Sequence, residues 1–284
     1  MEKCLLCGNQ CGIDRETEKG KCQVSNLKIA RRALHFFEEP IISGTRGSGT
    51  IFFCGCPLRC VFCQNESVSR NLVGREISVE KLVEIFHELE DMNAHNINLV
   101  NPTHYANEIL QALKIYKPKI PVVWNTHGYD SEKTIEKTKG LVDIYLPDLK
   151  YFDDNLAMKY SSAKDYFAVA TKAILAMRKN VADSYFDDGM MKSGLIVRHL
   201  ILPKCYKDSL EIVKWLDENL HGTLVSIMSQ YTPFGDLTNF PEINRKLFKG
   251  EVDIVCKEAV KRDMQGFFQD KSASSEEYIP KWDY

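Results

Sequence analysis

The pattern that most constrains the fold of this chain is a regular alternation of short apolar segments with amphipathic ones. Six segments are short, apolar and β-branched enough to be buried on both faces, and they lie at 49–54, 96–100, 121–124, 143–146, 195–202 and 223–228. The stretches between them carry apolar residues at helical spacing, which predicts helices at 78–92, 105–116, 131–139, 164–179 and 208–220. Strands that alternate with helices in this way are typical of a parallel α/β sheet.

Six strand-helix units are too few to close an eight-stranded barrel, so we expect an open, partial (β/α)6 TIM-like barrel. At 284 residues, of which 44% are hydrophobic and 27% charged, the chain can bury one large core, or one core and a small module. In parallel barrels the chemistry collects where the strands end, because the following loops converge at that rim. Polar residues follow most of the predicted strands, so this rim is the expected site.

Three cysteines follow the first predicted strand directly. Cys56, Cys60 and Cys63 form a C-x3-C-x2-C tripod, and Phe62 precedes the third cysteine. Three thiolates on one loop can bind three irons of a 4Fe-4S cluster and leave the fourth iron without a protein ligand, which opens it to chemistry. A closed structural site would need a fourth ligand nearby, and residues 64–100 contain no cysteine. We therefore expect these cysteines to be both cluster ligands and catalytic.

A second group of four cysteines lies near the start of the chain, at Cys4, Cys7, Cys11 and Cys22. Clustered cysteines in a chain without a secretion signal favour metal binding over disulfides. Their number and spacing suit zinc or a second iron-sulfur cluster, and the spacing does not choose between the two. A structural role is the preferred interpretation, and an electron relay is the alternative.

The expected division of the chain has three parts. Residues 1–45 form a small cysteine-rich metal-binding module and its lead-in, 46–270 the barrel, and 271–284 a polar tail. A formal net charge of -2 gives no general reason to bind nucleic acid. The chain has no run of 18 apolar residues and no signal segment, so we expect no membrane contact and a cytoplasmic location.

The tripod and the aromatic residue before its third cysteine resemble the signature of the radical S-adenosylmethionine (SAM) superfamily. Further stretches resemble radical SAM proteins related to the pyruvate formate-lyase activating enzyme, namely 4–22, 38–50, 98–104, 148–150, 198–200 and 230–231. The resemblance implies that SAM binds the open iron and is cleaved reductively to methionine and a 5'-deoxyadenosyl radical, which abstracts hydrogen from a substrate. It also implies an oxygen-sensitive oxidoreductase that takes electrons from a low-potential donor, flavodoxin or ferredoxin.

Four rim residues are candidates for contacts to SAM. Asp148 and Lys150 lie two apart on an extended segment and so share a face, from which they could bind the ribose hydroxyls and the carboxylate of SAM; a strand-end ion pair is the alternative. Asn101 and Thr103 offer oxygens to the SAM ammonium group, where the activating enzymes have a Gly-Gly-Glu type motif.

The remaining candidates each have a plain structural alternative. Asn125 could contact SAM or substrate, or be a turn residue. Arg198 and His199 alternate across the sheet, so at most one should face the barrel interior, and Arg198 is the candidate cofactor contact. Phe62 is expected to pack on the cluster, the adenine or the core. His104 and His127 are expected to be exposed at the rim.

The substrate stays open at this stage. In the activating enzymes it is a backbone glycine of a partner enzyme, so a protein substrate and glycyl-radical activation are one prediction. A radical SAM enzyme acting on a peptide or a small molecule is the alternative, and a non-catalytic, metal-stabilised binding protein is the alternative from another class.

Overall fold

The computed structural model describes residues 3–269 of the chain. The strands are β1 (Lys28–His35), β2 (Ser48–Phe53), β3 (Arg75–Glu76), β4 (Ile97–Val100), β5 (Val122–Thr126), β6 (Ile144–Pro147), β7 (Tyr185–Asp187), β8 (Met190–Leu200), β9 (Leu224–Met228) and β10 (Gly266–Gln269). The helices are α1 (Pro40–Ser43), α2 (Glu66–Ser69), α3 (Val79–Asp91), η1 (Thr103–Tyr105), α4 (Ala106–Ile115), α5 (Glu132–Lys137), α6 (Asp154–Ser161), α7 (Tyr166–Asn180), α8 (Tyr206–Leu220) and α9 (Lys249–Lys261).

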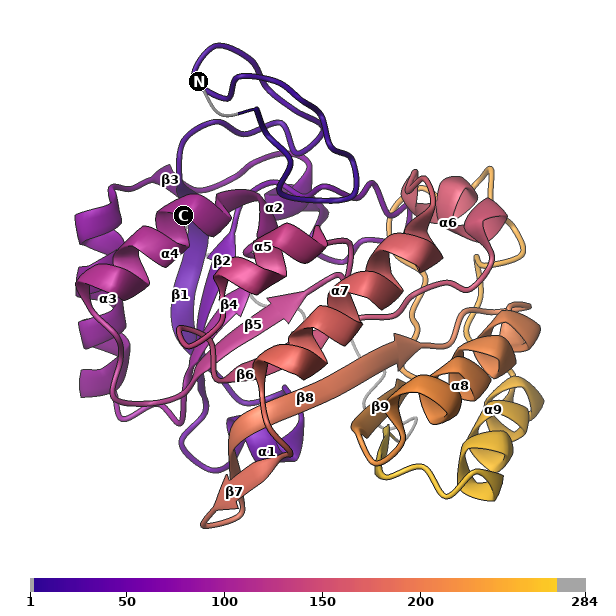
Figure 1. Cartoon of the computed structure of the whole chain (residues 1–284). Helices are drawn as coiled ribbons and strands as arrows, with labels where there is room; N and C mark the ends of the chain where they lie inside the picture. Colours follow the sequence, from indigo (N-terminus) through magenta and orange to yellow (C-terminus); the bar gives the residue numbers. More distant parts are fainter. Residues whose placement is uncertain (1–2, 270–284) are drawn as a thin grey trace.

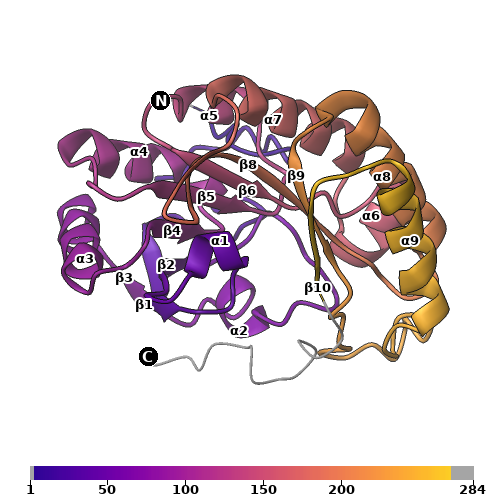
Figure 2. The same ribbon diagram turned by 90° about the horizontal axis from the view of Figure 1, so that it is seen from below.

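One curved sheet organises the molecule. Its strand order is β10-β9-β8-β6-β5-β4-β2-β1-β3, and the run from β2 to β10 is parallel throughout. Helices α3, α4, α5, α7, α8 and α9 form an arc on the convex side of this sheet (Figure 2). All six predicted parallel strands and all five predicted helices are present. The partial TIM-like barrel is therefore confirmed.

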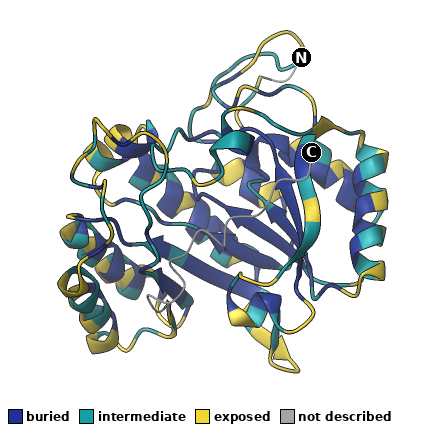
Figure 3. Cartoon of the chain, turned by 180° about the vertical axis from the view of Figure 1, so that it is seen from behind, coloured by how far each residue is buried: buried dark blue, intermediate teal, exposed yellow. Residues whose placement is uncertain are grey.

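The two faces of each parallel strand pack against different partners. Ile97 and Leu99 of β4 belong to the main core, which the sheet shares with the outer helices. Val123 of β5 and Ile144 of β6 belong to a second cluster on the inner face. Most residues of the parallel strands are consequently buried on both sides (Figure 3), as their continuous apolar sequence requires.

Local signals fix the helix that follows β3. Ser78 accepts a hydrogen bond from the backbone N–H of Lys81, which caps α3 at its first turn. Leu82, Phe86 and Leu89 are buried at helical spacing along its inner side. The predicted start and apolar face of this helix are both confirmed.

The antiparallel edge of the sheet is an addition that the strand-helix pattern did not predict. β1 pairs with β2 and with β3, and it runs so that His35 lies opposite Ser48, at the amino end of β2. The chain then forms the floor segment, residues 36–47, which contains α1 and lies across the lower end of the sheet (Figure 1). The floor segment thus enters the barrel from the end opposite the tripod.

The cysteine-rich part of the N-terminal module, residues 3–27, has no helix or ladder strand and lies over the carboxyl ends of the strands (Figure 1). It is tied to the loop after β5 by backbone hydrogen bonds, from Gly8 N to Tyr129 O at 3.0 Å and from Ser131 N to Leu6 O at 3.1 Å.

The predicted division into a module, a barrel and a tail falls only partly within the described residues. The boundary at residue 45 remains a prediction, although β1 lies inside the span assigned to the module and its lead-in, and the tail at 271–284 lies outside the described residues. Within the part of the chain that the structure describes, no helix is long and apolar enough to cross a membrane.

Candidate functional site

The tripod loop begins where β2 ends, at the rim of the barrel. Gly55 precedes Cys56 with φ +84°, in the left-handed region that favours glycine. A Cβ on Gly55 would also lie 2.7 Å from the carbonyl oxygen of Cys22, so the N-terminal module and the tripod loop are in direct contact. Glycine at this position lets the chain turn into the loop while the module packs against it.

Each tripod sulfur has a polar neighbour. Cys60 Sγ accepts a hydrogen bond from Ser161 Oγ at 3.0 Å, and Cys63 Sγ lies 3.4 Å from Ser69 Oγ. Burial raises the pKa of the Cys60 thiol, and the positive charge of Lys150 opposes this rise. A bound cluster would therefore displace thiol protons and place negative sulfur beside a cation, which is the environment that thiolate ligands need.

The tripod cysteines are suited to the separate corners of a cubane. Across residues 3–269, no group of three or more His, Cys, Asp or Glu side chains is placed to hold one metal ion. A cubane does not require that, because each cysteine binds a different iron at a separate corner. The three tripod thiols, which share one loop and have charged and hydroxyl neighbours, fit a 4Fe-4S cluster.

The same finding bears on the cysteines of the N-terminal module. Burial, with smaller contributions from Cys11, Cys22 and Cys4 as neighbouring negative groups, raises the pKa of Cys7 to about 12. The four side chains therefore lie near one another, but the structure does not assemble three of them around one point. Zinc or a second cluster at this position remains a prediction.

Three charged residues meet where β6 and β8 end. Asp148 pairs with Lys150 Nζ at 2.5 Å and with Arg198 Nε at 2.8 Å. Burial by itself would raise the pKa of Asp148, but the two cations outweigh burial and hold the pKa at about 2. The strand-end ion pair that was the alternative for Asp148 and Lys150 is thus present, and Asp148 is ionised at neutral pH.

Arg198 connects this group to the barrel interior. Its Nη2 donates to Asn125 Oδ1 at 2.7 Å, and its Nη1 lies 3.1 Å from Glu38 Oε2. Asn125 Nδ2 in turn donates to Glu38 Oε1 at 3.2 Å. Asn125, Asp148, Lys150 and Arg198, which are candidates from three separate segments of the sequence, are therefore one connected polar cluster.

Glu38 is a member of this cluster for which the sequence analysis proposed no role. It arrives from the floor segment at the other end of the barrel, so the rule that the site lies at strand ends could not identify it. The one sequence signal is a pair of adjacent carboxylates, Glu38 and Glu39, just before Pro40 in a stretch that also carries the family resemblance.

Asn101 lies beside the tripod. Its Nδ2 donates to the carbonyl of Gly55 at 2.6 Å, one residue before Cys56. Its Oδ1 is buried and has no hydrogen-bond partner anywhere in the described chain. An acceptor that is buried without a partner is costly, so this oxygen suits a ligand donor such as an ammonium group.

The structure does not bring Thr103 into the polar cluster. Thr103 Oγ1 donates to Asp130 Oδ1 at 2.8 Å, and Asp130 also accepts from Trp124 Nε1 at 3.1 Å and from Thr126 Oγ1 at 2.6 Å. This network is buried and orders the turn after β5. Its place in the fold supports a structural role for Thr103, and the SAM contact remains only a prediction.

The expectation that two rim histidines are exposed is wrong. His104 is 2% exposed and His127 7% exposed, and burial lowers the pKa of each to about 3. The 3-10 turn η1 directs His104 back toward the sheet, where Nε2 lies 2.7 Å from the carbonyl oxygen of Cys54. Both imidazoles are therefore neutral at physiological pH.

The other two candidates behave as expected. His199 contacts the Leu149 carbonyl and Ser209 Oγ, whereas Arg198 joins the polar cluster, so neighbouring residues of β8 do face opposite sides. Phe62 packs edge-on against Tyr231, with ring centroids 5.7 Å apart, at the carboxyl end of β9. A hydrophobic wall therefore flanks the tripod.

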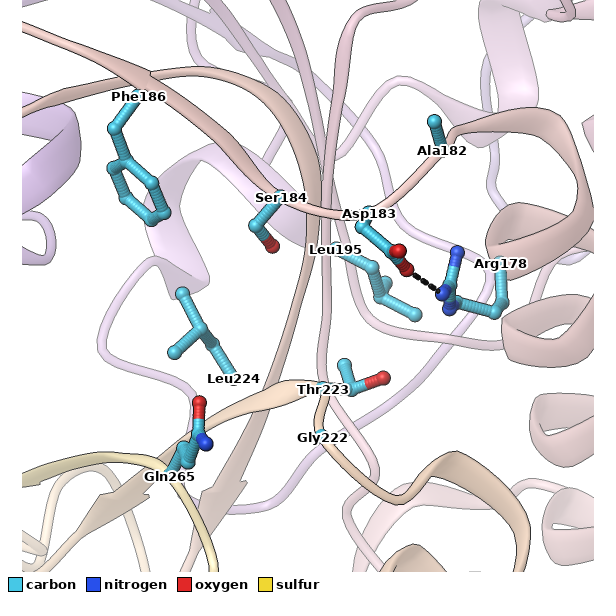
Figure 4. A pocket seen from close by; sticks show the side chains of 10 residues that line it. All are labelled: Arg178, Ala182, Asp183, Ser184, Phe186, Leu195, Gly222, Thr223, Leu224 and Gln265. Atoms are coloured by element: carbon cyan, nitrogen blue, oxygen red, sulfur yellow. Dashed lines mark hydrogen bonds and ion pairs between the residues drawn. The ribbon is translucent and has the colours of Figure 1, made fainter.

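A separate cavity of about 250 Å³ lies at the opposite end of the sheet (Figure 4). Thr223 and Leu224 at the start of β9 line it, and Arg178 forms an ion pair with Asp183 at its edge. It contains none of the proposed site residues, and the candidate site is the rim that carries the tripod.

Two solved structures resemble this fold. SuiB from Streptococcus suis has a TM-score of 0.52 and 15% identity over 76% of this chain, and methylornithine synthase (PylB) has a TM-score of 0.52 and 14% identity over 74%. This chain spans 47% of SuiB and 60% of PylB. At these identities the likeness shows the fold alone.

Sequence similarity extends further. The chain is 30% identical over 263 residues to the uncharacterised protein MJ0674 of Methanocaldococcus jannaschii, an alignment that covers 89% of this chain and 73% of that protein. Residues 50–197, which include the tripod, Asn125, Asp148 and Lys150, match the model of the radical SAM superfamily. With this match across half of its length, on the fold and the cysteine loop already described, the chain belongs to the radical SAM superfamily.

Proposed function

We propose that this protein is an enzyme that cleaves SAM reductively at a 4Fe-4S cluster held by Cys56, Cys60 and Cys63. The observation that carries the proposal is that three features lie on one rim: the tripod, Asn101 and the Asp148 cluster. Within the described residues, Asn101 Oδ1 has no hydrogen-bond partner. Cluster and SAM, when bound, supply a 5'-deoxyadenosyl radical that abstracts hydrogen from a substrate.

The residues of this chain then have separable tasks. Asn101 Oδ1 accepts from the SAM ammonium, since its own amide group is already fixed to Gly55. Asp148 is ionised and held by two cations, so its carboxylate can accept from the ribose hydroxyls without taking up a proton. Lys150 lies between this carboxylate and the Cys60 thiol, where it offsets the negative charge of bound thiolate and can bind the SAM carboxylate.

Phe62 and Tyr231 exclude water from one side of the tripod. Their rings meet at 5.7 Å, and Tyr231 is 3% exposed. Excluding solvent matters in this chemistry because competing hydrogen donors would quench a carbon radical. A low-potential flavodoxin or ferredoxin is the electron donor we propose, as cleavage of a sulfonium requires a reductant near the low end of the iron-sulfur range.

Two finer assignments belong to the proposal. The N-terminal cysteines Cys4, Cys7, Cys11 and Cys22 bind zinc or a second cluster, supported by the mutual charge effects of their thiols. Metal analysis with Mössbauer spectroscopy of the tripod variant separates the two metals. The substrate that the family resemblance favours is a backbone glycine of a glycyl radical enzyme. A glycyl EPR signal on such a partner protein would test this assignment.

The first experiment measures 5'-deoxyadenosine after anaerobic cluster reconstitution and dithionite reduction in the presence of SAM. We expect release by the natural protein and none by a variant with all three tripod cysteines changed to Ala. Cys54→Ala is the matched control, because Cys54 is buried two residues away and its Sγ contacts the Val73 carbonyl instead. Equal release by the triple variant would contradict the proposal.

A variant that releases no product is informative only if the natural protein binds SAM. The EPR spectrum of the reduced cluster provides this measurement, as SAM bound at the open iron changes it. A full cluster whose spectrum does not respond to SAM would refute the assigned binding site.

A further inference from the structure

The floor segment brings two carboxylates into the barrel. Ile42 is fully buried and packs against Val123 and Ile144 on the inner faces of β5 and β6, and its carbonyl accepts from Asn96 Nδ2 at 2.7 Å. These contacts hold the floor segment in one place. Glu38 and Glu39 precede α1, so both are presented to the barrel interior below the rim.

The charges around these carboxylates do not balance. Arg198 is shared between Glu38 and Asp148, and Lys150 pairs with Asp148. Glu39 is 1% exposed, and its Oε2 has no hydrogen-bond partner among residues 3–269. The two cations therefore form ion pairs with Glu38 and Asp148. Glu39 is the carboxylate without an ion pair in the described chain.

Two further polar side chains point to the same place. Asn98 and Ser226 are both fully buried, and each lies between two main-core residues of its strand, so alternation turns them to the inner face. Asn98 lies close enough to Glu38, and Ser226 close enough to Glu39, for each to act as a weak hydrogen-bond donor that lowers the pKa of that carboxyl group. In the described part of the chain, neither amide atom of Asn98 nor Ser226 Oγ makes a hydrogen bond of normal geometry.

In a cluster with only a structural role, the buried polar groups would be expected to pair with one another. Buried polar groups in folded proteins are paired almost without exception, since each unpaired one costs free energy. Here four atoms on three buried side chains lack a hydrogen bond of normal geometry within residues 3–269, and one belongs to a carboxylate. Burial raises the pKa of Glu39, and a cationic donor at this position would relieve that cost.

We propose that Glu39, with Asn98 and Ser226, forms a binding site for a primary ammonium group of the substrate inside the barrel. The site lies below the rim where we place SAM, so an ammonium held there would position the attached carbon chain toward the reacting centre. The inference rests on the proposed function for calling the ligand a substrate, although the binding site itself is independent of it.

The test measures binding without catalysis. The melting temperature of the anaerobically reconstituted protein is followed with n-propylamine, which is protonated at pH 7.5, and with n-propanol as the neutral molecule of the same shape. Sodium chloride at equal ionic strength controls for a bare cation. We expect a rise of about 2–4 °C with the amine alone.

Two variants assign the effect to Glu39. Glu39→Gln keeps the shape and removes the charge, and we expect it to weaken amine binding about 10- to 100-fold. Glu76→Gln changes an exposed carboxylate at the sheet edge and should respond as the natural protein does. A structural role alone for Glu39 would lower the melting temperature of the free protein and leave the selectivity for amine unchanged.

Each outcome decides the inference. Equal responses to amine and propanol, a response to sodium chloride, no response at all, or an unchanged response in Glu39→Gln would overturn it. If the amine binds selectively, a stronger response to Nα-acetyl-L-lysine amide would assign the ammonium to a peptide side chain, and a weaker one to a small molecule. Failure of the proposed function is distinct, because it appears as absent 5'-deoxyadenosine release whatever the melting data show.

Discussion

Replacement of Arg198 by Gln tests whether the polar cluster is held together by charge. Arg198 contacts Asp148 at 2.8 Å and Glu38 at 3.1 Å, and its side chain is 15% exposed. A pKa near 2 for Asp148, against an ordinary 3.8, corresponds to about 2 kcal/mol of stability at neutral pH. Glu38 also loses its ion pair with Arg198, so the total cost should reach about 3–5 kcal/mol.

The sign of the pH dependence follows from the same groups. The lowered pKa of Asp148 contributes stability that is complete above its ordinary value of 3.8 and is lost as the pH falls toward 2. Burial already raises the pKa of Glu38 with Arg198 present, and without Arg198 burial weighs more heavily on Asp148 as well. Both pKa values then rise, and the two groups take up protons as the pH falls from 7. The stability difference between the natural protein and Arg198→Gln should therefore shrink between pH 7 and pH 4.

The assay is thermal unfolding followed by circular dichroism at both pH values, under anaerobic conditions. The expected loss at pH 7 corresponds to about 6–20 °C in melting temperature. Arg178→Gln is the control, since its partner Asp183 is 93% exposed and a surface pair contributes little. A double variant that adds Glu38→Gln should regain part of the loss. A difference that is the same at pH 7 and pH 4, or below 2 °C at pH 7, would refute the reasoning.

Two further predictions concern the neighbours of the site. Gly128→Ala would place a Cβ 2.2 Å from the Asp148 carbonyl at φ +78°, and we expect a loss of about 2–3 kcal/mol in urea unfolding; Gly140→Ala, at φ +77° with no atom within 4 Å, isolates the conformational part and should lose less. Ser161→Ala removes the hydrogen bond to Cys60 Sγ, so the reduction potential of the reconstituted cluster should become more negative in an EPR redox titration, and an unchanged potential would contradict this role.

The parallel part of the fold could be predicted from the sequence, because the positions of apolar residues indicate which segments and faces are buried. Each predicted strand is a short, mostly apolar segment, as expected of a strand that is buried on both faces. β1 was missed for the opposite reason. It lies at the antiparallel edge and carries Arg31 and Arg32 in its centre, so its sequence reads as polar. β10, Gly266–Gln269, was also not predicted.

The site was predictable only where its residues obey the strand-end rule. Asn125 and Asp148 follow their predicted strands and are joined by Arg198. Arg198 lies within its predicted strand, 195–202, and was a candidate because neighbouring residues alternate across the sheet. Glu38 breaks the rule, because it reaches the same cluster from the floor of the barrel. The strand-end rule places His104 and His127 at the rim, but it does not predict the turns that follow the strands. The backbone geometry of those turns buries both side chains. Sequence position predicts the end of the sheet on which a residue lies, not the direction of its side chain.

The N-terminal module contacts the tripod loop through hydrogen bonds that do not depend on a bound metal. Asn9 Nδ2 donates to the Pro57 carbonyl inside the tripod loop at 2.8 Å and lies 3.8 Å from Cys7 Sγ. Arg59 Nη2 donates to the Lys21 carbonyl at 2.8 Å, from within the same loop. Because these hydrogen bonds already restrict the tripod loop, the loop loses less conformational entropy when it binds a cluster. We therefore expect order in the module to be transmitted to the tripod loop through these hydrogen bonds.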